Sequence, residues 1–404
     1  MTGAPLFSYI VLSYNYEMYI GTTIRSILQQ TIQNFEIIVV DDASIDGSRE
    51  IVSGFGDPRI RLLSNERNMG GAWSYNRAVK AARGEWLVNL DADDWIAPGK
   101  AAIQLDALAA HPELDIIGTY VNLRDAKGET HPQASELEAN CNDLLDLNTI
   151  DPWVGRNPLC RSSTMVRRAA HLRIGLDDPT MVRAPDYELW TRALRAGCRF
   201  AVIPERLTFM RMQSSGVTFG DPTSSLLEIS YAMLRNLVPL AEERALLPSL
   251  QRMIEWVARH EQLSTLRPVE AFRLLGMMMT GSPPLGDFST FRAALSDSQS
   301  DPALAHLGRR CQLFLRGDMI GGDGAEKLFR DVEAFIEARD YWHDRAAAAT
   351  EARDYWQLQA EEATESCNRW REQSAAWERA YRRTLRWKLG RLARKTYSRF
   401  FLSS

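Results

Sequence analysis

Three carboxylates stand together where an apolar segment of the chain ends. Residues 85–90 (EWLVNL) are followed directly by Asp91, Asp93 and Asp94. Apolar residues bounded by charge predict a strand that is covered on both faces, and carboxylates this close together repel one another unless a cation lies between them. A hard divalent ion takes oxygen ligands, and magnesium retains phosphate oxygens as partners. The pattern predicts a metal–diphosphate site; the alternative is a solvated acidic turn before the helix that Pro98 begins.

The elements that would position this turn alternate between strands and helices. The first expected strands cover 7–13, 36–40, 59–64 and 85–90, and the helices between them cover 18–30, a short segment after Gly47, and a segment that ends at Arg83. Beyond them we expect a helix from Pro98 to His111 and strands at 115–123, 161–168, 200–203 and 206–212. Strands and helices that alternate at this spacing predict a parallel sheet with right-handed crossovers.

Polar residues follow each of the first four expected strands. They are Ser13-Tyr14-Asn15, Asp41-Asp42, Asn68 with Gly70, and the acidic residues of 91–94. In a parallel sheet these strand ends share one edge, which is where open α/β sheets bind ligands. The coincidence favours a nucleotide site over a solvated turn.

The composition is ordinary for a soluble globular protein of two or three domains, with 404 residues, 45% hydrophobic and 25% charged. No apolar run approaches the roughly 20 residues of a membrane span, and the run from Phe7 to Leu12 is too short for a signal peptide. The five cysteines are scattered and form no metal or redox motif. We therefore expect reduced thiols in a cytoplasmic protein, and any membrane contact would be at the surface.

Several segments together resemble the family 2 glycosyltransferases in motif, order and spacing. They are residues 10–15 (IVLSYN), 26–31 (SILQQT), 38–47 (IVVDDASIDG) and 90–94 (LDADD). The resemblance covers about residues 6–220. It implies a glycosyltransferase A-type fold with a Rossmann-like sheet, a nucleotide-sugar donor that we expect to be a UDP-sugar, a divalent metal (Mn or Mg), and inversion at the anomeric carbon.

The resemblance also implies roles for four residues in the first half. Tyr14 would stack on the base, and Asp42 would accept a hydrogen bond from it; the alternative for Asp42 is an N-cap of the next helix. Asp91 would contact the ribose or a metal-bound water, and Asp93 would ligate the metal. Both aspartates belong to the predicted metal site.

Further members of the expected donor-binding set are Ser13, Asn68, Gly70, Asn76 and Arg211. Asn76 matches a family asparagine, whereas Tyr75 stands where the family has an arginine. Arg211 begins a segment that looks like the loop closing over the diphosphate. Gln213 stands where that loop usually carries a histidine, which implies a metal held by fewer protein groups.

The second half supplies a candidate general base. Pro185 at a first helical turn and Gly197 past the end bracket one helix, which resembles the family's Glu-Asp catalytic helix with Asp186 at the base position and Pro185 in place of the Glu. Inversion requires a carboxylate that takes the proton of the attacking hydroxyl. The alternative for Asp186 is a carboxylate favoured by the helix dipole.

Beyond the catalytic segment the sequence shows long helical patterns and no further strand patterns. We expect a catalytic domain at 1–225, a helical domain at 226–325, a coiled coil at 326–384 and a basic amphipathic tail at 385–404. The hexapeptide EARDYW occurs at 337–342 and 351–356, and apolar residues recur seven apart at Leu328, Phe335, Trp342, Ala349, Trp356, Ala363, Trp370 and Trp377. Such a stripe predicts a coiled coil. We favour a second copy of this chain as the partner of the coiled coil. The alternatives are another protein or the chain's own helical domain.

The tail carries basic and aromatic residues and no acidic residue after Glu378. Such a mixture suits an anionic membrane or a nucleic acid. The family resemblance favours the membrane, since many acceptors in this family are lipid-linked, and we expect no nucleic acid partner. A solvated tail is the alternative.

Together these observations predict an inverting, metal-dependent hexosyltransferase. It would move sugar from a nucleotide sugar to a polysaccharide or lipid-linked glycan in cell-surface or extracellular glycan synthesis, working in the cytoplasm or at the inner face of the cell membrane. One alternative is a nucleotidyltransferase, which uses a similar nucleotide-binding half. Such an enzyme would not need a carboxylate in the second half of the domain, such as Asp186. An assembly scaffold with a decayed transferase domain is disfavoured by the retained Asp42, Asp91, Asp93 and Asp186.

Overall fold

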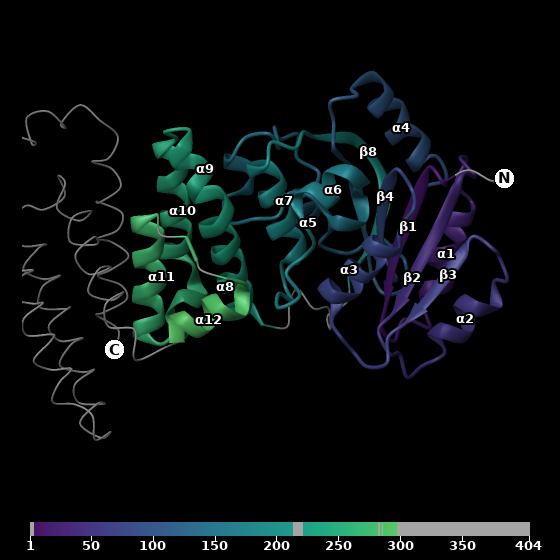
Figure 1. The fold of residues 1–404 in the computed structure, drawn as a ribbon, viewed down its shortest axis with the longest axis horizontal. Helices are drawn as coiled ribbons and strands as arrows, with labels where there is room; N and C mark the ends of the chain where they lie inside the picture. Colours follow the sequence, from purple (N-terminus) through teal and green to yellow (C-terminus); the bar gives the residue numbers. More distant parts are fainter. Residues whose placement is uncertain (1–3, 213–220, 282, 285, 297–404) are drawn as a thin grey trace, which may run out of the picture. The chain divides into compact units, whose positions relative to one another are not determined.

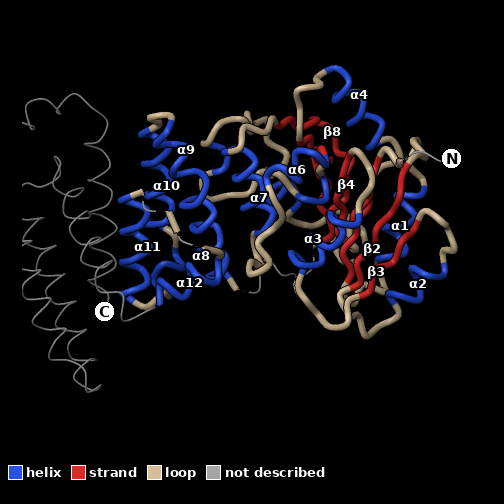
Figure 2. Tube along the Cα trace, viewed as in Figure 1, coloured by secondary structure: helices blue, strands red, loops and turns tan. Residues whose placement is uncertain are grey.

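The computed structural model describes residues 4–212, 221–281, 283–284 and 286–296. The predicted coiled coil, the predicted basic tail and Gln213 lie outside these residues. Figure 1 shows the chain as a ribbon, and Figure 2 distinguishes helices from strands. Among the described helices, none is long and apolar enough to cross a membrane.

The α/β part begins with the predicted alternation. Its elements are β1 (Phe7–Ser13), α1 (Ile20–Leu28), β2 (Phe35–Asp41), α2 (Ser48–Gly54), β3 (Ile60–Ser64), α3 (Gly71–Ala81), β4 (Trp86–Asp91), β5 (Trp95–Ile96), α4 (Lys100–Ala110), β6 (Ile116–Arg124), α5 (Ala134–Glu138), β7 (Met165–Arg167), α6 (Arg168–Ile174), α7 (Pro185–Arg195) and β8 (Phe200–Arg211). Later helices are α8 (Pro222–Ala232), α9 (Val238–Glu243), α10 (Leu247–Arg259), α11 (Pro268–Thr280) and α12 (Phe288–Ser296).

One mixed sheet of eight strands has the order β3-β2-β1-β4-β7-β6-β8-β5. β1 pairs in parallel with β2 and β4, and β2 pairs in parallel with β3, which confirms the parallel arrangement predicted for the first four strands. β7 lies antiparallel between β4 and β6, and β5 lies antiparallel to β8. The second half of the sheet is therefore mixed.

Two predicted strand limits differ from the structure. The strand expected at 161–168 is a 3₁₀ turn at Arg161–Ser163 followed by the short β7. The strands expected at 200–203 and 206–212 are one strand, β8, whose pairing with β6 shifts register beside Tyr120. The register shifts on both sides of Tyr120, and the first shift spans Pro204, since proline cannot donate a ladder hydrogen bond and is accommodated at a bulge.

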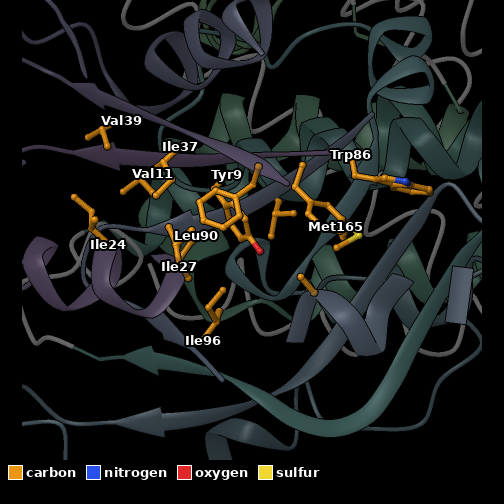
Figure 3. Close-up of a cluster of buried hydrophobic side chains, with 14 of the residues drawn as sticks. Tyr9, Val11, Ile24, Ile27, Ile37, Val39, Trp86, Leu90, Ile96 and Met165 are labelled. Carbon is orange, nitrogen blue, oxygen red and sulfur yellow. The ribbon is translucent and has the colours of Figure 1, made fainter. Parts of the chain in front are cut away.

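The main core lies between α1 and one face of the parallel strands. Ile24 and Ile27 of α1 pack with alternate residues of the strands, such as Tyr9, Ile37 and Leu90 (Figure 3). Alternation puts these side chains on one face, while α3 contacts β1 and β2. Covered on both faces, β1, β2 and β4 hold the residues at their carboxyl ends in fixed positions.

Two compact units divide the chain. Among the described residues, the first comprises those up to Arg244 together with Pro284 and 286–291, and the second comprises those of 245–283 together with 292–296. The helices α8 and α9 thus belong to the same unit as the sheet. The division into four domains, with its limit at residue 225, stays a prediction.

Candidate active site

The ends of β1, β2 and β4 bring the first predicted residues together. Ser13 pairs with Asp41 across β1 and β2, and Leu12 pairs with Asp91 across β1 and β4. The predicted polar clusters therefore share one edge of the sheet, as parallel strands require.

Asp42 organises the loop between β3 and α3. Its carboxylate accepts hydrogen bonds from Nδ2 of Asn65 at 2.6 Å and from the main-chain N–H groups of Met69 and Gly70, both at 2.8 Å. A carboxylate offers about four acceptor positions, so one more hydrogen bond can be accepted. The next helix, α2, has Gly47 as its N-cap, which excludes the capping alternative for Asp42.

Residues around Asp42 differ in exposure. Tyr14 is 44% exposed, so its ring can stack on a ligand, whereas Ser13 is buried and its Oγ has no hydrogen-bond partner in the described part of the chain. Asn68 is exposed, and its Oδ1 accepts a 3.2 Å hydrogen bond from the N–H of Gly70. Gly70 has φ +88°, a backbone conformation that favours glycine.

Asp91, Asp93 and Asp94 occupy the turn after β4 in different environments. Asp91 is exposed, Asp93 is half-buried and Asp94 is buried. The pKa of Asp94 is held well above its ordinary value, first by burial and then by the negative charges of Asp93 and Asp91. The N–H of Arg211 donates a 2.8 Å hydrogen bond to Oδ1 of Asp94 and offsets part of this effect.

Mutual repulsion within this acidic turn fits a cation. Its side chains offer only oxygen ligands, the type preferred by Mg²⁺ and Mn²⁺. In the described ranges, no three His, Cys, Asp or Glu side chains form a group that could hold a metal. The carboxylate oxygens of the turn fit a hard divalent ion, which would take its remaining ligands from phosphate and water.

Arg211 holds the acidic turn through its main chain and its side chain. Its Nε donates to the carbonyl of Asp93 at 3.1 Å, and its Nη1 donates to the carbonyls of Asp125 and Ala126 at 3.0 and 2.8 Å. The guanidinium also lies 4.5 Å from the ring of Tyr19. In this structure Arg211 supports the turn, and the predicted contact with a donor stays a prediction.

Asp186 lies in the first turn of α7 and is half-buried. Its Oδ2 accepts a 2.8 Å hydrogen bond from Nδ2 of Asn157, and its Oδ1 accepts one of 2.9 Å from the N–H of Tyr187. The segment that contains Asn157 also reaches the acidic turn, because Oγ of Ser162 accepts a 3.0 Å hydrogen bond from the N–H of Asp91. Residues 157–162 therefore connect the candidate base to the acidic turn.

Arg161 is a charged residue of this region that sequence reasoning missed. Its Nη2 donates to Oδ2 of Asp177 at 2.7 Å, and its guanidinium lies 4.2 Å from the ring centre of Tyr75. Burial raises the pKa of Asp177 to about 6, and the positive charge of Arg161 opposes that rise. The sequence signal was Tyr75 at the position of the family arginine, because an aromatic ring there can support a guanidinium from elsewhere.

Asn76 has a structural partner rather than an open side chain. Its Nδ2 donates to the carbonyl of Asp177, and its Oδ1 accepts from the N–H of Asp177, both at 2.8 Å. Donor binding by Asn76 stays a prediction, and its amide is used here to hold the segment that precedes α7.

Comparison with solved structures supports the fold. The structure of S. aureus TarS in complex with UDP superposes with a TM-score of 0.50 at 21% sequence identity, covering 75% of this chain and 87% of TarS. The shared fold defines the class of protein: a chain with a glycosyltransferase A-type, Rossmann-like domain.

Sequence comparison gives the family. Residues 8–172 match the model of glycosyl transferase family 2. An uncharacterized glycosyltransferase of Haemophilus influenzae is 32% identical over 236 residues, which are 56% of this chain and 69% of the relative. The chain belongs to glycosyltransferase family 2 and is a glycosyltransferase.

Two named relatives match over shorter parts. The UDP-Glc:alpha-D-GlcNAc-diphosphoundecaprenol beta-1,3-glucosyltransferase WfgD of Escherichia coli is 41% identical over 116 residues, covering 28% of this chain and 46% of WfgD. The succinoglycan biosynthesis protein ExoO of Rhizobium meliloti is 30% identical over 209 residues, covering 50% of this chain and 59% of ExoO.

Proposed function

We propose that this glycosyltransferase is an inverting, metal-dependent hexosyltransferase that uses a UDP-sugar donor. The observation that carries the proposal is that one segment, residues 157–162, binds both parts: Asn157 donates to Asp186 at 2.8 Å, and Oγ of Ser162 accepts from the N–H of Asp91 at 3.0 Å. An inverting reaction needs both parts in one site: a base for the acceptor and an acidic turn for the donor.

Each residue would act through the contacts described above. Tyr14 would stack on the base, and Asp42 would use its remaining acceptor position for a base N–H. Asp93 and Asp91 would hold Mn²⁺ or Mg²⁺, which when bound neutralises charge on the departing diphosphate. Asp186, held by Asn157 and with lone pairs left on both oxygens, would take the proton of the acceptor hydroxyl.

The acceptor class is inferred from relatives. WfgD is named for a diphosphoundecaprenol-linked acceptor, and ExoO is named for succinoglycan biosynthesis. We propose a polysaccharide or lipid-linked glycan as acceptor, with the enzyme on the cytoplasmic face of the membrane. A salt-sensitive contact of the 385–404 tail with anionic lipid would support that position, and co-sedimentation with anionic and neutral vesicles tests it.

A panel of nucleotide sugars, incubated with Mn²⁺ and with a chelator in parallel, tests the proposed activity. We expect one UDP-sugar to give free UDP in the presence of metal and none with chelator. In a parallel incubation with UTP and a sugar 1-phosphate, release of pyrophosphate would indicate nucleotidyl transfer instead. No turnover of any member of the panel, with or without glycan acceptors, would support the decayed scaffold.

A further inference from the structure

Glu228 lies on α8, outside the residues matched by the family and outside the catalytic domain expected from the sequence. Its side chain is almost fully buried, with 1% exposed. Its Oε1 accepts a 2.9 Å hydrogen bond from the N–H of Val182, and its Oε2 accepts bonds of 2.7 Å from the N–H groups of Arg183 and Ala184. One buried carboxylate therefore gathers three consecutive main-chain amides.

These amides belong to the segment that enters the catalytic helix. Ala184 is the N-cap of α7, Pro185 is the first helical residue, and Asp186 follows it. Of these three amides, only that of the N-cap Ala184 is one of the first amides of the helix, which find no acceptor within it; Val182 and Arg183 precede the helix. Glu228 supplies acceptors for all three from another helix, and its negative charge is also favoured near the positive end of the α7 dipole.

The segment before α7 has further ties within the same compact unit. Asp178 accepts a 2.8 Å hydrogen bond from the N–H of Phe288 through Oδ2, and its Oδ1 accepts from the N–H of Thr180. Asp177 is tied to Asn76 and Arg161, as described above. Residues 177–184 are thus fixed at both ends, and Glu228 fixes the end that adjoins Asp186.

We infer that Glu228 is a positioning residue for the general base: it fixes the start of α7 and thereby the carboxylate of Asp186. The inference rests on the proposed function, in which Asp186 is the base. Misplacement of a catalytic group by about 1 Å can reduce the rate about 100-fold. Loss of the Glu228 carboxylate should therefore reduce turnover without changing UDP binding, because Tyr14, Asp42 and the acidic turn, which would bind the base and the diphosphate, lie at the ends of β1, β2 and β4.

The variant Glu228→Gln keeps the volume of the side chain but places an NH₂ group against main-chain N–H donors. The matched control is Glu242→Gln, since Glu242 is exposed on α9. We would measure UDP release from a mixture of UDP-glucose, UDP-galactose and UDP-N-acetylglucosamine with Mn²⁺, and UDP binding by calorimetry. Both substitutions would also be made in the Asp186→Asn background, to give a double-mutant cycle.

We expect Glu228→Gln to lower turnover about 10- to 100-fold, to leave UDP affinity within about twofold, and to have almost no effect once Asp186 is Asn. Unchanged turnover, or an equal loss in both backgrounds, would overturn the inference. Near-full turnover of Asp186→Asn alone would instead overturn the base assignment of the proposed function.

Two further measurements apply if Glu228→Gln does not fold or if the wild type releases no UDP. If Glu228→Gln does not fold, Glu228→Asp, which keeps the charge on a shorter side chain, takes its place in the same cycle. If the wild type releases no UDP from the mixture, amide hydrogen exchange over 182–186 decides: we expect faster exchange in the Glu228 variant than in Glu242→Gln, and equal exchange would overturn the inference.

Discussion

Asn76 and Asp177 exchange two hydrogen bonds of 2.8 Å, although 101 positions separate them in the sequence. Nδ2 of Asn76 donates to the carbonyl of Asp177, and Oδ1 of Asn76 accepts from the N–H of Asp177. The pair therefore joins α3, which follows the edge of the sheet proposed to bind the nucleotide, to the segment that leads into α7.

Replacement of Asn76 by Ala should destabilise the fold. The substitution leaves a buried main-chain N–H and carbonyl without partners, and each such group costs about 1–3 kcal/mol. We expect a lower free energy of unfolding in urea, together with reduced turnover because the segment before α7 loosens. Asn140→Ala, at an exposed position, is the control; equal stability of the two variants would contradict this account.

Replacement of Asp93 by Ala should abolish metal-dependent donor binding and leave the fold intact. The charge of Asp93 raises the pKa of Asp94, so its removal relieves repulsion within the turn. Calorimetry of UDP binding with and without Mn²⁺ measures the effect, and Asp106→Ala, on the exposed side of α4, is the control. Metal-dependent affinity that survives in Asp93→Ala would remove Asp93 from the metal site.

Replacement of Asp186 by Asn should keep the size of the side chain and remove the proton acceptor, at the cost of one of the two hydrogen bonds that Asp186 accepts from Asn157 and Tyr187. Loss of a general base reduces the rate by about 10²–10⁴, and UDP affinity should change little. Initial rates of UDP release measure this. Full turnover would point to Asp177 or Asp178, although the structure ties Asp177 to Arg161 and Asp178 to the N–H of Phe288.

The sequence predicted those parts of the fold that depend on local pattern. The alternation of strands and helices and the shared edge for Asp42 and Asp91 followed from apolar runs and their polar ends. The contacts of Glu228 and Arg161 did not, because a hydrogen bond between distant segments leaves no periodic signal. The bulge at Pro204 could be predicted only in part. The proline indicated an interruption between two strands, but the pairing of β8 with β6 shows that one strand continues through it.

Glu36 makes stability depend on pH in a defined direction. Its buried carboxylate accepts from Oγ of Ser8 at 2.8 Å and pairs with Arg61 and Arg83 at 2.7 and 2.8 Å. Burial would raise its pKa, but the hydrogen bonds from Arg83, Arg61 and Ser8 outweigh burial and lower it below 4.5. Because the folded pKa is depressed, the carboxylate stabilises the fold above about pH 4.5, and this contribution is lost as pH falls through the folded pKa.

Replacement of Glu36 by Gln should therefore cost about 1–3 kcal/mol of unfolding free energy at pH 7, and the difference from wild type should shrink towards pH 3. Urea unfolding at a series of pH values measures both. A difference that is independent of pH would show that the packing of Glu36, and not its charge, stabilises the sheet.

The apolar stripe from Leu328 to Trp377, which repeats every seven residues, leads to a prediction about assembly. A single amphipathic stripe this long needs a partner surface to bury its aromatic residues, and we propose a second copy of the chain. A chain that ends at residue 327 should then have a lower mass per particle than the full chain, by at least a factor of two after correction for the lost residues. A chain that ends at Glu378 keeps every position of the stripe and should match the full chain, because the basic tail is not part of the stripe.

Light scattering of the three proteins measures the masses. Equal corrected masses for all three would mean that the stripe packs within one chain or binds another protein, whereas a fall already at Glu378 would assign self-association to the tail.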